Sequence, residues 1–170
     1  IENIGIITLG LGIGLWGQIA HQELAALIGY AGALLHVFNH AVFKGLLFLS
    51  AGSVIRSTGT GEIDRLGGLL KRLPWTGHFF LVGSLAICGL PLFNGFVSEW
   101  LVYRALFEGM FHFELNGIVL SSLAVISLAL IGGLAAACFA KAFGAIFLGN
   151  SRSIDITRVK ENSALMCVPM

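Results

Sequence analysis

The stretch that decides the fold is LAALIGYAGALLHVFNHAVFKGLLFLSAGSVI, residues 24–55. It is much longer than the ~20 apolar residues with which a helix crosses a bilayer. His36, His40 and Lys44 follow one another at intervals of four residues inside it. In a helix they lie on one side, each about 6 Å further along the axis. Because ionisable groups are costly in hydrocarbon and usually mark an ion or proton route, this stripe predicts proton transfer.

The composition indicates an all-α, polytopic membrane protein. Hydrophobic residues make up 56% of the chain and charged residues 11%, whereas soluble domains carry about 25% charged residues. The glycines of GLGIG (10–14) follow no strand, so they favour close helix packing over a nucleotide-binding loop. No basic cluster suits a nucleic acid. The chain begins with Ile1 and stops at CVPM, from which we expect an internal part of a longer protein.

Four membrane spans are expected, and the third contains a break. Gly89, Pro91, Asn94 and Gly95 lie in its middle. Proline removes a backbone donor and glycine does not resist unwinding, so the pattern predicts two half-helices with irregular backbone near the bilayer midplane. Two shorter spans or a re-entrant pair are the alternative. The expected spans are Ile4–Ala20, Leu24–Ile55, Trp75–Phe107 and Gly117–Leu148.

Charge orients these spans. The connections near 21–23 and 108–116 contain Glu23, Glu108 and Glu114 but no lysine or arginine. The opposite side is basic, and by the positive-inside rule it is cytoplasmic. Residues 1–150 are therefore expected in the membrane, and 151–170 form a cytoplasmic connection towards a further helix. The basic residues are Arg56, Arg65, Lys71 and Arg72 before the third span, and Arg152, Arg158 and Lys160 after the fourth.

Five ionisable residues are candidates for proton transfer at membrane depth: His36, His40, Lys44, Glu99 and Lys141. Three neighbouring positive charges would repel, so the stripe is expected to share few protons through bridging waters. Glu99 directly follows the break and is placed to supply an opposing charge. Lys141 also has the alternative of extending to the membrane interface. The histidines have two other interpretations, a metal-binding HxxxH pair and hydrogen-bonded structural groups.

Three motifs resemble the antiporter-like membrane subunits of respiratory complex I, Mrp-type cation/proton antiporters and membrane-bound nickel–iron hydrogenases. They are HVFNHAVFKGLLFLSAGSVI, GEIDRLGGLLKRLP and GLPLFNGFVSEW. The sequences IENIGII, KRLPW and CFAKAFGAIFLG are most similar to the hydrogenase 4 and formate hydrogenlyase branch of that family. The similarity covers nearly all of residues 1–150.

The resemblance implies a large helix bundle with two inverted repeats, each containing one discontinuous helix. Residues 1–150 would hold most of the second repeat. His36, His40 and Lys44 match the family's HxxxHxxxK stretch, and Glu99 falls where relatives carry lysine or glutamate on the broken helix. Lys141 matches a position that is often basic. The glutamate–lysine pair of the first repeat is not in these residues.

The expected function is that of a proton-translocating membrane subunit in a hydrogenase-type or complex I-like redox complex of the prokaryotic inner membrane. A cation/proton antiporter subunit and an inert membrane anchor for a peripheral redox arm are the alternatives. No catalytic redox site, cofactor or metal is expected in this chain. The resemblance places nickel–iron and iron–sulfur centres in partner subunits. The expected partners are other membrane subunits, a peripheral redox arm, the lipid bilayer, and protons or sodium.

Overall fold

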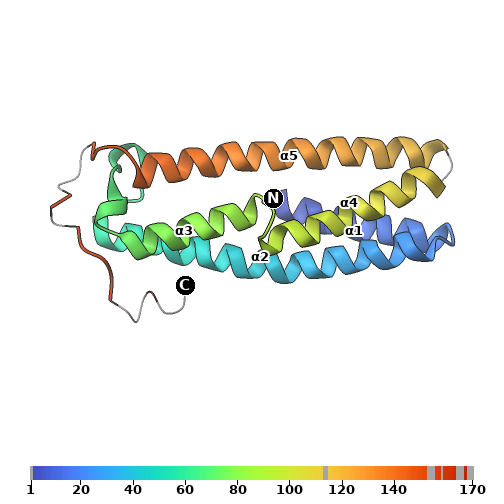
Figure 1. Cartoon of the computed structure of the whole chain (residues 1–170), viewed down its shortest axis with the longest axis horizontal. Coiled ribbons are helices and arrows are strands. Elements are labelled where there is room, and N and C mark those ends of the chain that lie inside the picture. Colours follow the sequence, from blue (N-terminus) through green and yellow to red (C-terminus); the bar gives the residue numbers. More distant parts are fainter. Residues whose placement is uncertain (1, 113–114, 153–155, 158, 164–166, 168–170) are drawn as a thin grey trace. The chain divides into compact units, whose positions relative to one another are not determined.

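The computed structural model describes residues 2–112, 115–152, 156–157, 159–163 and 167. These residues form helices and no strand, which confirms the all-α prediction (Figure 1). The elements in chain order are α1 (Glu2–Ile19), α2 (Glu23–Thr58), the short 3₁₀ helices η1 (Ile63–Arg65) and η2 (Leu69–Lys71), α3 (Pro74–Ile87), α4 (Asn94–His112) and α5 (Leu115–Phe147).

In the part of the chain that the structure describes, two helices are long and apolar enough to cross a bilayer. They are α2, with 36 residues, and α5, with 33. The expected count of four spans is thus supported at two of its four positions. The first expected span, Ile4–Ala20, corresponds to the shorter helix α1.

The third expected span, Trp75–Phe107, consists of two helices in the structure. Helix α3 ends at Ile87, and α4 begins at Asn94. Gly89 and Pro91 lie in the non-helical segment 88–93, and Gly95 is the second residue of α4. Gly89 has φ +61° and Leu92 has φ +81°. A segment with two left-handed residues cannot continue a right-handed helix, so the chain is interrupted here.

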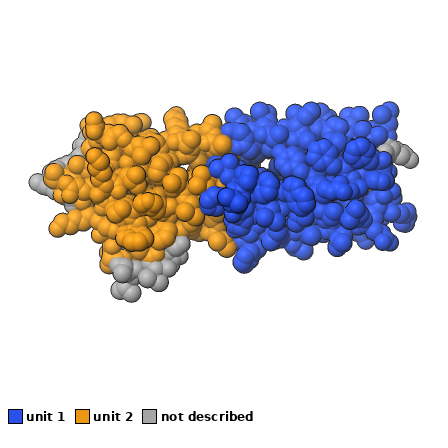
Figure 2. Space-filling view, in the orientation of Figure 1, with its two compact units in different colours: residues 1–41, 88–134 blue, residues 42–87, 135–170 orange. Residues whose placement is uncertain are grey.

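The chain divides into two compact units, each built from two stretches of sequence (Figure 2). Unit 1 contains Ile1–Ala41 and Cys88–Leu134, and unit 2 contains Val42–Ile87 and Ala135–Met170. Both α2 and α5 therefore contribute residues to each unit.

Small residues bring α1 and α2 close together in unit 1. A Cβ added at Gly17 would lie 2.6 Å from the Ala26 nitrogen, and one added at Gly29 would lie 2.8 Å from the Gly14 nitrogen. Only glycine permits such close approach of two backbones. Of the glycines in GLGIG, Gly10 and Gly14 also lie against α2, as predicted, whereas nothing lies within 4 Å of a Cβ at Gly12. Apolar side chains of α1, α2, α4 and α5 complete the core: Ile6, Ile13, Ala25, Val102, Ala105, Leu106 and Leu128.

Polar contacts fix the beginning of α3 in unit 2. The Thr76 hydroxyl donates to the Glu161 carboxylate at 2.7 Å, and the backbone N–H of Trp75 donates to the same carboxylate at 2.9 Å. Asn162 Nδ2 donates to the hydroxyl oxygens of Ser53, at 2.6 Å, and Ser57, at 2.9 Å, on α2. The segment 159–163 therefore holds the N-terminus of α3 against the end of α2.

Candidate functional site

His36 is fully buried on α2 and makes hydrogen bonds with two other helices. Its Nδ1 lies 2.9 Å from Ser98 Oγ of α4, and its Nε2 lies 3.0 Å from Asn3 Oδ1 of α1. Because a carbonyl oxygen of an amide only accepts, Nε2 carries the hydrogen of this contact. The first residue of the predicted stripe is therefore held by neutral polar groups within unit 1.

Asn39 links α2 to the beginning of α4. Its Nδ2 donates to the Asn94 carbonyl oxygen at 2.8 Å and to Ser98 Oγ at 3.1 Å. Its Oδ1 accepts from Asn94 Nδ2 at 3.2 Å. Asn39 is buried, and a buried amide with both ends paired fixes the geometry around it. These contacts place the first turn of α4 directly beside His36.

We call Asn3, His36, Asn39, Asn94 and Ser98 the polar network. Sequence reasoning singled out His36 and placed Asn94 in the break, but it missed the other three residues. Asn39 carried a usable signal, because an amide inside an apolar span is costly unless it is paired. Asn3 and Ser98 carried none, since short polar side chains are common near helix ends.

Glu99 directly follows Ser98 on α4 and is half-buried. Its carboxylate lies against Gly89, where an added Cβ would collide with both carboxylate oxygens. Glu2 of α1 and Tyr103, one turn further along α4, are close enough to Glu99 for electrostatic interaction. Glu99 therefore faces the backbone of the non-helical segment.

The remaining predicted residues lie in different surroundings. His40 is half-buried in unit 1 and interacts electrostatically with His36. Lys44 belongs to unit 2, where its Nζ lies 5.3 Å from the centre of the Phe48 ring, a cation–π contact. It lines a hollow of about 190 Å³ whose other walls are apolar: Leu47, Phe48, Ala51, Phe80 and Phe139. Lys141 is exposed on α5.

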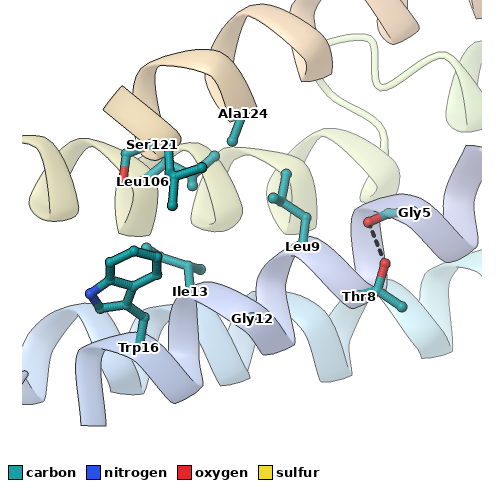
Figure 3. Close-up of a pocket in the computed structure, with 10 residues that line it drawn as sticks. Gly5, Thr8, Leu9, Gly12, Ile13, Trp16, Leu106, Ser121 and Ala124 are labelled. Atoms are coloured by element: carbon teal, nitrogen blue, oxygen red, sulfur yellow. Dashed lines mark hydrogen bonds between the residues drawn. The ribbon is translucent and has the colours of Figure 1, made fainter. Parts of the chain in front are cut away.

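A larger hollow of about 390 Å³ lies in unit 1 between α1, α4 and α5 (Figure 3). Its walls are mainly apolar, with Leu9, Ile13 and Trp16 from α1 and Leu106 from α4. The Thr8 hydroxyl beside it already donates to the Gly5 carbonyl oxygen at 3.0 Å. No predicted proton-transfer residue is among the residues that line it in the described part of the chain. The predicted proton-transfer residues therefore do not line this hollow.

A sequence model of the NADH:quinone oxidoreductase/Mrp antiporter transmembrane family matches residues 11–127. The chain belongs to this family. The match covers the second half of α1, all of α2 to α4, the beginning of α5, the non-helical segment and every residue of the polar network except Asn3. Membership in a transmembrane family, together with two helices long enough to span, indicates an integral membrane protein.

Relatives within the family carry the names of complex subunits. The chain is 42% identical to hydrogenase-4 component B of Escherichia coli and 41% identical to formate hydrogenlyase subunit 3 of the same organism, in each case over 100% of the chain. It spans 25% and 27% of the lengths of these two proteins. It is also 34% identical, over 74% of its length, to Na(+)/H(+) antiporter subunit A1 of Staphylococcus haemolyticus, of which it covers 16%.

Proposed function

We propose that this chain is part of a proton-translocating membrane subunit in a hydrogenase-type redox complex. The observation that carries the proposal is the fully buried His36, joined by a hydrogen bond to Ser98 of α4, next to Glu99, whose carboxylate lies against the non-helical segment. Buried ionisable groups beside interrupted helices are characteristic of ion pathways. The identity to hydrogenase-4 component B and formate hydrogenlyase subunit 3 supports the hydrogenase type.

The proposed carriers are His36, His40 and Lys44 of α2, with Glu99 beside the break and Lys141 in a supporting role. His36 takes up a proton at Nδ1, because its Nε2 already carries a hydrogen. Lys44 lines a hollow whose other walls are apolar, and an ionisable group in such surroundings is costly unless it has a function. Successive residues of the stripe are about 6 Å apart along α2, so protons would pass between them through water.

Electron transfer would take place in partner subunits of the complex, which would hold the nickel–iron and iron–sulfur centres. The chain would sit in the inner membrane of a prokaryote beside other membrane subunits and a peripheral redox arm. Its own residues would bind and release protons, and the non-helical segment would allow the first turn of α4 to shift between states.

The test replaces Glu99→Gln and Lys44→Met in the full-length protein and measures proton uptake by membrane vesicles supplied with formate or hydrogen. Because a positioned acid or base contributes about a hundredfold or more to proton transfer, we expect proton translocation to fall by that order. Assembly of the complex should not change. Glu108→Gln is the matched control, since Glu108 lies on the same helix but is already paired with Arg104.

Two outcomes would contradict the proposal. Full proton translocation in both variants would remove Glu99 and Lys44 from the pathway. Loss of assembly, with no separate transport defect in the complexes that remain, would support the inert-anchor alternative.

A cation/proton antiporter subunit is the second candidate. It is favoured by the identity to Na(+)/H(+) antiporter subunit A1 over 74% of the chain. Both functions would use the same ionisable residues, so the driving force and the coupled ion distinguish them.

A further inference from the structure

Ser98 has one hydroxyl hydrogen and two acceptors within reach. Its Oγ lies 2.9 Å from the Gly95 carbonyl oxygen and 2.9 Å from His36 Nδ1. Asn39 Nδ2 donates to the same Oγ at 3.1 Å. Since a hydroxyl has one hydrogen, Ser98 donates to either Gly95 or His36, but not to both.

The contact between His36 and Asn3 decides when each alternative applies. Asn3 Oδ1 accepts from Nε2, so Nε2 keeps its hydrogen and Nδ1 is the nitrogen that gains or loses a proton. When Nδ1 is bare, it needs a donor, and the Ser98 hydroxyl supplies it. When Nδ1 is protonated, it donates to Ser98 Oγ, and the hydroxyl hydrogen must turn to the Gly95 carbonyl oxygen.

We propose that Ser98 is a positioning residue that couples the protonation of His36 to the first turn of α4. Proton uptake at Nδ1 rotates the Ser98 hydroxyl from His36 to Gly95, one turn before Glu99. We call this rotation of the Ser98 hydroxyl the switch. Its use in proton translocation rests on the proposed function, whereas the rotation itself does not. In both states Asn39 holds Ser98 in place by donating to its oxygen and to the Asn94 carbonyl.

Ser98 does not carry the transferred proton. The hydroxyl hydrogen stays bonded to Oγ and only changes its acceptor, and the Gly95 carbonyl cannot pass a proton on. Ser98 therefore reports the state of His36 but does not conduct. Titratable groups near the switch are His40 on α2, which interacts with His36, and Glu2 and Glu99, which adjoin Asn3 and Ser98 in sequence.

The test records nitrogen-15 spectra of labelled histidine in the full-length protein in its membrane at alkaline pH. A His36→Gln variant identifies the His36 signals. We expect the wild type to show hydrogen on Nε2 and a hydrogen-bonded, bare Nδ1. In Ser98→Ala the Nδ1 resonance should move downfield, because this nitrogen loses its donor. Ser98→Thr should restore it, since it keeps the hydroxyl.

Ser84→Ala is the matched control. Ser84 is also buried, but its hydroxyl donates to the Phe80 carbonyl oxygen of its own helix. This variant should leave the His36 signals unchanged. Proton translocation, measured separately, should fall about tenfold in Ser98→Ala and recover in Ser98→Thr, the size expected for one hydrogen bond to a charged group.

An unchanged Nδ1 resonance in Ser98→Ala would overturn the coupling, as would a wild-type His36 with its hydrogen on Nδ1. Either result stands whatever the transport assay gives. Conversely, if the protein gives the predicted spectra but translocates no protons, the switch is supported and only the proposed function is refuted.

Discussion

Gly89 and Glu99 are matched to each other at the non-helical segment. Gly89 has φ +61°, which favours glycine, and the space that its side chain would occupy contains the Glu99 carboxylate. Two independent constraints therefore require glycine at this position. Because position 89 has no side chain, the Glu99 carboxylate can lie beside the main chain there; a methyl group at this position would displace it.

Gly89→Ala should destabilise the protein and displace Glu99. A side chain in the left-handed region costs about 1–2 kcal/mol, and the collision with the carboxylate adds to it. Gly133→Ala is the control, since nothing lies within 4 Å of a Cβ at that position on α5. Thermal unfolding of the purified full-length protein measures both. Equal stability of the two variants would contradict the geometry described for Gly89.

The spacing of His36, His40 and Lys44 could be found from sequence, because residues four apart share one side of any helix. The partners of His36 could not. Asn3 is 33 positions away and Ser98 is 62, and which short polar side chains meet a buried histidine depends on how three helices pack. Sequence reasoning therefore identified the costly groups but not the neutral residues that hold one of them.

At the level of the helices, local features could be predicted from the sequence, whereas contacts between segments far apart in the sequence could not. Proline and glycine act on the local backbone, so an interruption within residues 75–107 is a local inference, and the structure has α3 and α4 there as separate helices. The carboxylate at the beginning of α3 is not local. Glu161 reaches the Trp75 N–H across 86 positions of sequence, a contact that no periodicity indicates.

Glu161→Gln should loosen the first turn of α3. The carboxylate accepts from two consecutive N–H groups at a helix N-terminus, where a negative charge contributes about 1 kcal/mol. We expect hydrogen exchange at Trp75 and Thr76 to become about fivefold faster, because these amides open more often. Glu62→Gln is the control, since Glu62 pairs with Arg65 on an exposed surface. Equal exchange rates in both variants would contradict the capping role.

At the scale of the whole molecule, the chain corresponds to one part of longer relatives. It spans about a quarter of the two hydrogenase-type relatives, at 25% and 27% of their lengths. The broad class followed from composition and the stripe, since 56% hydrophobic and 11% charged residues exclude an ordinary soluble domain. The coupled reaction did not follow, because a redox-driven pump and an antiporter place the same ionisable groups in the same membrane.

The coupled ion and the driving force separate these two functions in the assembled, full-length complex. If the chain serves a redox-driven pump, proton movement in vesicles should require formate or hydrogen, and replacing sodium by potassium should not change its rate. Glu99→Gln should lower the donor-dependent rate by about a hundredfold in either buffer, because the half-buried carboxylate would act on protons and not on sodium. An antiporter behaves differently. Proton movement driven by a sodium gradient without any electron donor, and abolished by Glu99→Gln, would instead assign the pathway to cation/proton exchange.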